Sequence, residues 1–116
     1  MTDLYKAETS GDITILTLSL ADFVYEDNEK LMKSFDQLLN DGHKKIILDF
    51  VTTNYISSLI LASLVYVHKK AIEMGGALVL CNIKNRVKEI FTMTNLDKVF
   101  DIVPTKEEAI ARFGKK

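Results

Sequence analysis

The sequence predicts an α/β fold in which a mixed, mostly parallel sheet of four or five strands is joined by about four helices. Two observations predict this class. Short apolar runs rich in β-branched residues alternate with longer segments whose apolar residues recur at helical spacing. Glycines and the single proline fall between these segments, where turns are needed. Strands that alternate with helices pair in parallel through right-handed crossovers.

The first two strands are predicted to form a hairpin, which gives the sheet an antiparallel edge. Ile13–Leu18 is a run of apolar residues and threonines, and the turn residues Gly11 and Asp12 precede it. Tyr5–Thr9 is the candidate partner strand on the other side of that turn.

A first helix is predicted from Asn28 to Asn40. Asp27 is a candidate N-cap, and Asp41 followed by Gly42 is a candidate stop. Four apolar side chains fall on one stripe of this segment, at i, i+4, i+7 and i+8: Leu31, Phe35, Leu38 and Leu39.

The centre of the chain predicts two buried strands on either side of a long apolar helix. Ile46–Phe50 and Ala77–Cys81 are nearly continuous apolar runs, as expected of strands covered on both faces. The helix is predicted from Ser58 to Met74, and Gly75-Gly76 ends it. Its first turns are apolar nearly all round, so part of its surface requires cover from another helix or from a partner.

A third helix is predicted over Asn85–Met93, and Asn95 is the candidate left-handed residue after its end. Its apolar stripe consists of Val87, Ile90 and Phe91.

The last two elements are a short strand and a terminal helix. Val99–Val103 is predicted as the strand. Thr105 and Glu108 have the spacing of a capping box, so a helix is expected to follow through about Arg112.

Composition restricts the class of protein. Fifteen basic residues oppose 16 acidic ones, for a net charge of −1, which favours neither nucleic acid nor an anionic membrane. The single cysteine, Cys81, excludes an internal disulfide and fits a reducing compartment. The longest apolar run, Leu59–Val67, is too short to cross a bilayer, and the N-terminus does not read as a signal peptide. We therefore expect one cytoplasmic domain over residues 1–116, without membrane insertion or direct contact with nucleic acid.

Candidate functional residues gather where the second predicted helix begins. Ser57 and Ser58 lie at the entrance of that helix, where a hydroxyl caps backbone N–H groups or accepts a phosphate favoured by the helix dipole. Asp49 ends the most buried strand, at the edge of a parallel sheet where sites usually form. The alternative interpretation of Asp49 is a loop cap for Thr52 or Thr53.

Signals for metal binding or catalysis are weak. His43 lies in a turn, where a solvated role is expected, and His68 lies next to two lysines at the expected polar edge of the long helix. Cys81 ends an apolar strand and is expected to be a buried small side chain rather than a nucleophile. We therefore predict a binding module or switch rather than an enzyme, with no cofactor and no metal.

Three segments carry a family resemblance. Ile47–Phe50 followed by Tyr55–Ser58 gives a strand with its Asp and then an aromatic-Ile-Ser-Ser loop. Gly75–Asn82 gives a glycine turn, an apolar strand and an Asn. Asn85–Ile102 contains an Asn-x-Arg-Val-type start and a Leu-x-Lys ending, and is the most specific segment. Together, from about residue 13 to 110, they resemble the STAS domain family of anti-sigma factor antagonists.

The resemblance implies a function in partner switching. In that family, a kinase that also serves as the anti-sigma factor phosphorylates the loop serine. The unphosphorylated domain binds this partner and frees a sigma factor, and the phosphorylated domain releases the partner. By resemblance, the partner-binding residues are Asp49, Ser57, Ser58, Leu59, Ile60, Ala62 and Ser63.

The chain departs from the family pattern at the phosphorylation site. Aligned on Asp49 without gaps, Ser58 occupies the position of the first motif serine, Leu59 that of the usual phosphoserine and Ile60 that of the usual glycine. Either Ser58 is the phosphoacceptor after a one-residue shift, with Ser57 as the second candidate, or the domain is not phosphorylated.

Two other interpretations stay open. The loss of the usual phosphoserine favours an accessory STAS subunit of a transporter or of a larger signalling complex. An enzyme or small-ligand binder would have to use a pocket formed by Asp49, Ser57 and Ser58. The N-terminal strand and the apolar second helix also offer surfaces for a homodimer.

Overall fold

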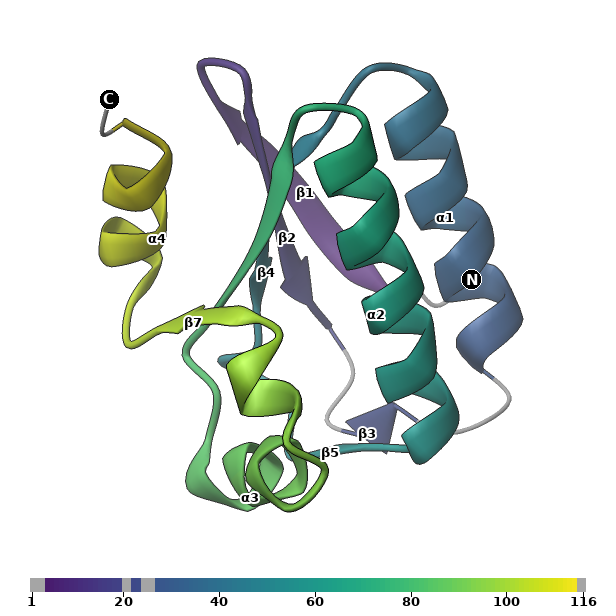
Figure 1. Cartoon of the computed structure of the whole chain (residues 1–116), viewed down its shortest axis with the longest axis vertical. Helices are drawn as coiled ribbons and strands as arrows, with labels where there is room; N and C mark the ends of the chain where they lie inside the picture. The colour runs from purple at the N-terminus through teal and green to yellow at the C-terminus, as the bar shows by residue number, and fades with distance from the viewer. Residues whose placement is uncertain (1–3, 20–21, 24–26, 115–116) are drawn as a thin grey trace.

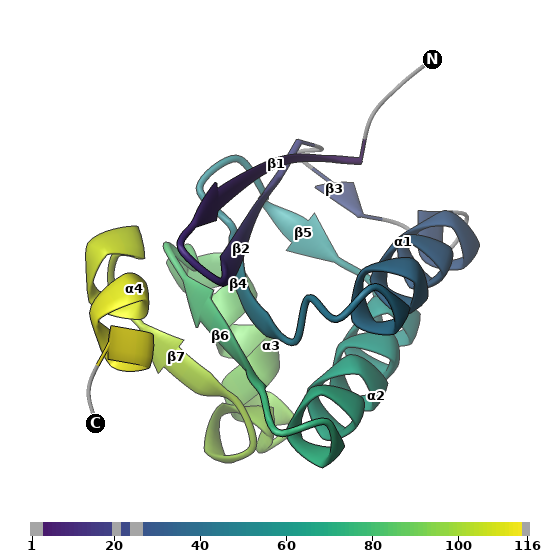
Figure 2. The ribbon, with the colours of Figure 1, turned by 90° about the horizontal axis from the view of Figure 1, so that it is seen from above.

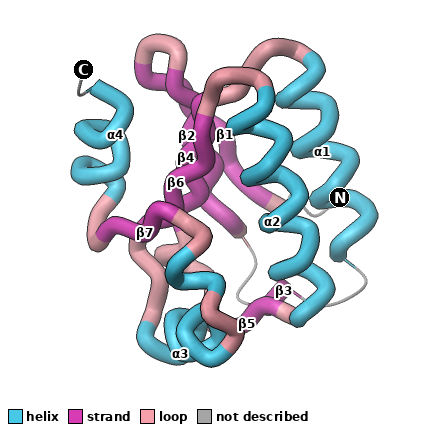
Figure 3. The backbone as a smooth tube through the Cα atoms, viewed as in Figure 1, coloured by secondary structure: helices cyan, strands magenta, loops and turns pink. Residues whose placement is uncertain are grey.

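The computed structural model describes residues 4–19, 22–23 and 27–114. Its centre is a five-stranded sheet (Figures 1 and 3), and the strand order is β1-β2-β4-β6-β7. β1 pairs antiparallel with β2, and all other pairs are parallel. The strands are β1 (Tyr5–Ser10), β2 (Ile13–Leu18), β4 (Lys45–Asp49), β6 (Ala77–Cys81) and β7 (Asp101–Val103). The predicted fold class, with its antiparallel hairpin at one edge, is confirmed.

Helices cover both faces of the sheet, as the view from above shows (Figure 2). Three of them pack on one face: α1 (Asn28–Asn40), α2 (Ser58–Glu73) and α3 (Asn85–Met93). α4 (Lys106–Gly114) packs on the other face. The central strands are therefore covered on both sides, which is why their sequences are continuous apolar runs.

Two cores result from the pleat of the strands. Ile46, Leu48 and Phe50 belong to the core under α1, α2 and α3, and Ile47 belongs to the core under α4. In the first core, the ring of Phe91 stacks edge-on against that of Phe50. The second core consists of Ile13, Ile15, Ile47, Val79, Cys81, Val103 and Ala109.

Several predicted boundaries are confirmed because local chemistry defines them. Gly42 has φ +91° and Asn95 has φ +62°, the left-handed conformations expected after α1 and α3. Gly76 leaves room for a close backbone approach, because a Cβ there would lie 2.0 Å from the carbonyl oxygen of Lys44. The Thr105 hydroxyl accepts a hydrogen bond from the backbone N–H of Glu108 at 3.1 Å, so the predicted cap of α4 is present.

The structure also corrects the sequence analysis. Asp27 does not cap α1, because its own backbone is already helical (φ −81°, ψ −14°) and its side chain makes no capping hydrogen bond among the described residues. The predicted last strand begins only at Asp101, because a 3₁₀ helix, η2 (Leu96–Lys98), and a helical Val99 precede it. A second small sheet was not predicted. It pairs β3 (Asp22–Phe23) in parallel with β5 (Tyr55–Ile56).

Candidate functional site

The predicted serines lie where the loop after β4 enters α2. β5 leads directly into Ser57, whose backbone is extended (φ −77°, ψ 162°) and whose hydroxyl accepts a hydrogen bond from the backbone N–H of Ile60 at 3.3 Å. Ser57 is therefore the N-cap of α2. Ser58 is the first residue of the helix, and it is exposed.

The two serines thus have different environments. The Ser57 hydroxyl is engaged in capping and half-buried, whereas the Ser58 side chain faces solvent. The first turn of α2, from Ser58 to Leu61, carries only uncharged residues, so nothing in it neutralises the positive end of the helix dipole. Of the two candidates, Ser58 has the environment in which a phosphate could be added and would be stabilised.

Exposed apolar side chains lie close to Ser58 in the sequence. Leu59 is 39% exposed and Tyr55, three residues before Ser58, is 44% exposed. Ala62 is exposed one turn further along the helix. We call Tyr55, Ser58, Leu59 and Ala62 the α2 N-terminal surface. It combines exposed apolar area with the hydroxyls of Ser58 and Tyr55, which is suited to contact with a protein.

Two residues of α2 in the predicted partner-binding set are buried. Ile60 is buried in the first core, because helical spacing places it on the same side as Leu64 and Val67. Ser63 is also buried, and its hydroxyl donates a hydrogen bond to the side-chain oxygen of Asn28 at the start of α1. Their side chains hold α2 against the sheet and α1, and the exposed members of the set are Ser58, Leu59 and Ala62.

Asp49 belongs to the other layer of the molecule. It follows Ile47 by two residues and pairs with Cys81, so its side chain lies on the face of the sheet that α4 covers. Only 5% of it is exposed. The sheet therefore separates the Asp49 carboxylate from the layer that Ser58 begins, and the structure does not bring the two together.

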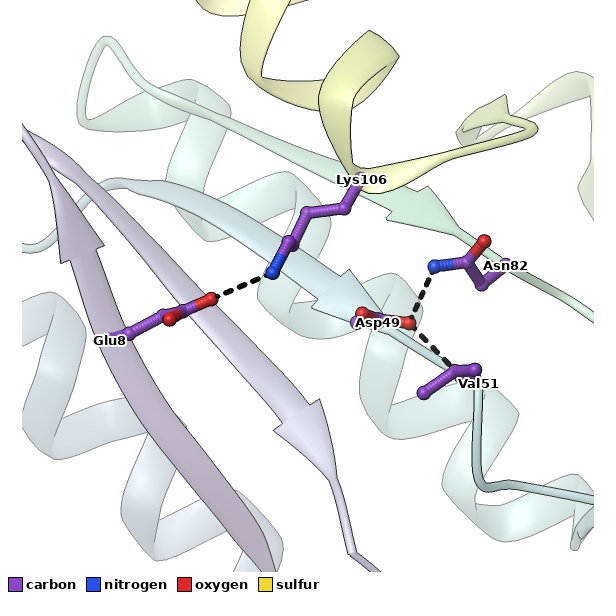
Figure 4. A network of polar contacts seen from close by, with 5 residues as sticks. All are labelled: Glu8, Asp49, Val51, Asn82 and Lys106. Atoms are coloured by element: carbon purple, nitrogen blue, oxygen red, sulfur yellow. Dashed lines mark hydrogen bonds and ion pairs between the residues drawn. The ribbon is translucent and has the colours of Figure 1, made fainter.

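The contacts of Asp49 show a structural role. Its Oδ1 accepts hydrogen bonds from the backbone N–H of Val51 at 3.0 Å and from the side-chain amide of Asn82 at 2.9 Å (Figure 4). Asp49 thus caps the loop that follows its strand. The backbone N–H that donates to Asp49 Oδ1 is that of Val51, which directly precedes Thr52 and Thr53.

Sequence reasoning missed the polar residues around this loop. Asn82 has a left-handed backbone (φ +55°), and Lys84 donates a hydrogen bond to Asn54 Oδ1 at 2.7 Å. Lys106 at the start of α4 pairs with Glu8 at 3.0 Å, and this hydrogen bond raises the pKa of the lysine. The one available signal was the Asn that directly follows a buried strand, since Asn tolerates the left-handed conformation.

Other titratable groups are placed as follows. Cys81 is fully buried, so the prediction of a buried small side chain is confirmed, and burial is the main cause that raises its pKa to about 12. His68 is half-buried and directly precedes the exposed Lys69, its ring packs on Phe100 with 5.3 Å between ring centroids, and burial lowers its pKa.

Residues 4–19, 22–23 and 27–114 contain no group of three or more His, Cys, Asp or Glu side chains that could hold a metal ion. Within the same ranges, no helix combines the length and the apolar character needed to span a membrane.

Comparison with known proteins agrees with the fold and the resemblance. The STAS domain family model matches residues 5–109. An anti-sigma factor antagonist of Bordetella bronchiseptica named BtrV is 31% identical over 85 residues, which cover 73% of this chain and 73% of that protein. One from Thermotoga maritima is 32% identical over 92 residues, 78% of this chain and 81% of that protein.

A solved structure is also similar over nearly the whole chain. The crystal structure of an anti-sigma factor antagonist from Thermotoga maritima superposes with a TM-score of 0.87 at 26% identity, and the match covers 96% of this chain and 95% of that one. The fold, the family model and the relatives agree, and the chain therefore belongs to the STAS domain family.

Proposed function

We propose that this STAS domain is an anti-sigma factor antagonist that acts in the cytoplasm. It binds an anti-sigma factor through the α2 N-terminal surface, and phosphorylation of Ser58 by that partner, acting as a serine kinase, releases it. The protein is a binding module rather than an enzyme and uses no cofactor. The names of its relatives support the general role.

One observation carries the proposal. Ser58 is exposed at the uncompensated positive end of α2, directly before the exposed Leu59 and three residues after the exposed Tyr55. In the unphosphorylated protein, apolar area next to a small hydroxyl is available for a partner to cover. A phosphate would add about −1.5 to −2 charges there, so a partner would have to desolvate it and the complex would dissociate.

Ser58 is the proposed phosphoacceptor because neither of its neighbours has a free hydroxyl. Ser57 is engaged as the cap of α2, and the usual phosphoserine position holds Leu59, which has no hydroxyl. A one-residue shift of the acceptor keeps the phosphate within reach of the free backbone N–H groups of the first helical turn.

The test is capture of the partner from the native cells followed by a kinase assay. The captured anti-sigma factor is incubated with this protein and Mg-ATP, and peptide mass spectrometry locates the phosphate. We expect phosphate on Ser58, none on the Ser58→Ala variant, and unchanged labelling of the Ser10→Ala control. Capture of a kinase that leaves Ser58 unmodified would contradict the switch.

The second candidate function is an accessory STAS subunit of a transporter or larger signalling complex. The leucine at the usual phosphoserine position favours it, because a permanent subunit needs no releasable contact. The same capture experiment distinguishes the two functions, since transporter subunits instead of an anti-sigma factor would support the second.

A further inference from the structure

The β4–β5 loop connects the sheet to the α2 N-terminal surface, and a neighbouring loop fixes it in place. It runs from Phe50 to Asn54, and β5 and the Ser57 cap follow it without a break. Its own closure is a turn, in which the backbone N–H of Thr53 donates to the carbonyl of Phe50 at 3.0 Å. The position of this loop therefore sets where Tyr55 and Ser58 are presented.

The first contact with the neighbouring loop lies at the sheet. The Asp49 carboxylate is almost fully buried, and a single oxygen of it accepts from both Val51 N–H and the Asn82 amide (Figure 4). Hydrogen bonds to a charged, poorly solvated acceptor are the stronger kind. Asn82 thus binds the carboxylate of Asp49, and this carboxylate in turn binds Val51, the second residue of the loop.

Two hydrogen bonds hold the backbone at Asn82. Its backbone N–H donates to the carbonyl of Pro104 at 3.2 Å, which ties it to the segment before α4. The carbonyl of Cys81, the preceding residue, accepts from the backbone N–H of Phe50 at 3.0 Å. The left-handed backbone of Asn82 (φ +55°) aims its short side chain back at Asp49.

A second contact holds the far end of the same loop. The Lys84 ammonium donates to Asn54 Oδ1 at 2.7 Å, one residue before β5 begins. Both residues are exposed, so this contact contributes less than the one at Asp49. The β4–β5 loop is nevertheless fastened at both ends to the same neighbour, the segment from Asn82 to Lys84.

We propose that Asn82 is a positioning residue for partner binding: through Asp49, it holds the β4–β5 loop in the conformation that presents Tyr55 and Ser58. This proposal rests on the proposed function of the α2 N-terminal surface. A loop that is held before binding does not have to be ordered by the partner, so the contact raises affinity without touching the partner.

The test is the variant Asn82→Gly, with Asn95→Gly as its matched control. Glycine accepts a left-handed backbone at both positions (φ +55° and +62°), so each variant removes an amide side chain without introducing backbone strain. Only Asn82→Gly breaks a contact with the loop. Two readouts are measured: hydrogen exchange of residues 51–58 in the free protein, and affinity for a purified anti-sigma factor of the serine-kinase class captured with the wild type.

We expect Asn82→Gly to speed exchange across residues 51–58 and to weaken binding about fivefold, the equivalent of one hydrogen bond. Asn95→Gly should leave exchange in this segment unchanged and affinity within about twofold of the wild type. If exchange in Asn82→Gly were unchanged, the contact between Asn82 and Asp49 would not hold the loop in place. Faster exchange with unchanged affinity would overturn its role in binding.

A second variant separates this contact from general destabilisation. Asn82→Asp keeps a short side chain that tolerates the left-handed backbone but replaces the amide donor with a second carboxylate against Asp49. We expect Asn82→Asp to weaken binding more than Asn82→Gly does. A smaller defect than that of Asn82→Gly would contradict the direct contact. If the wild type binds no anti-sigma factor at all, the proposed function fails, and hydrogen exchange still decides whether the loop is held.

Discussion

The starts of α2 and α4 lie at the carboxyl edge of the same sheet and have opposite electrostatics. α4 begins with the cap Thr105 and carries Glu107 and Glu108 in its first turn, so its own side chains compensate its positive end. α2 begins with the cap Ser57 and continues with uncharged residues only. Both helices therefore have an N-cap, but only at α2 is the positive end of the helix dipole left to interact with an added negative charge.

The two regions also differ in what they expose. Beneath α4, the chemically distinctive side chains Asp49 and Cys81 are buried. At α2, Ser58 and Leu59 are exposed. The α4 layer thus has a structural role, and the α2 N-terminal surface is where binding is proposed.

The rate at which Cys81 is alkylated shows whether α4 keeps reagents away from the core beneath it. A pKa of about 12 leaves the Cys81 thiol with about a thousandfold less thiolate at pH 8 than a thiol of pKa 9, and α4 also blocks access. We expect alkylation by iodoacetamide to be at least that much slower in the native protein than in urea. Comparable alkylation rates in the native protein and in urea would show that α4 opens readily and would contradict the difference drawn between the two regions.

Alanine substitutions at Ser57 and Ser58 should change the free energy of unfolding by different amounts. Ser57→Ala removes the cap of α2 and should lower the free energy of unfolding by about 1 kcal/mol. Ser58→Ala removes an exposed hydroxyl and should change it by less than about 0.5 kcal/mol. Urea denaturation followed by circular dichroism measures both. Equal losses would mean that the capping assignment is wrong.

The smallest expected effect concerns His68, further along α2. Burial lowers its pKa in the folded protein below the usual 6.5, so the unfolded chain binds the proton more readily. The contribution of neutral His68 to the free energy of unfolding is therefore complete above about pH 6.5 and decreases as the pH falls below that value.

Thermal unfolding between pH 5 and pH 8 tests this dependence. The melting temperature of the wild type should fall on the acid side, and His68→Gln should show a shallower fall than the control His43→Gln, since His43 is exposed. Identical pH profiles for the two variants would assign the acid sensitivity to other groups.

Much of the fold could be predicted from the sequence because its signals are local. The helix Asn28–Asn40, the strand Ala77–Cys81 and the helix Asn85–Met93 were predicted with the bounds that the structure has. Each combines an apolar pattern with a turn residue at its end. The two-residue strands β3 and β5 could not be predicted, because two residues are too few to show a period.

The candidate site was only partly predictable, for a reason that lies in strand geometry. In a strand covered on both faces, both sets of alternating residues are apolar, so the sequence does not tell which face the last side chain takes. Asp49 was therefore assigned to the serines although its side chain lies under α4. The ring contact between His68 and Phe100 could not be predicted either, because the two residues are far apart in the sequence.

The most direct test of the central claim is the affinity of the Ser58→Asp variant for the anti-sigma factor, with Ser10→Asp as the control at an exposed site on β1. An acidic residue in the first turn of a helix is stabilising, so weaker binding by Ser58→Asp would not reflect unfolding. We predict a loss of about a hundredfold for Ser58→Asp and less than about twofold for Ser10→Asp. Wild-type affinity in Ser58→Asp would contradict the account.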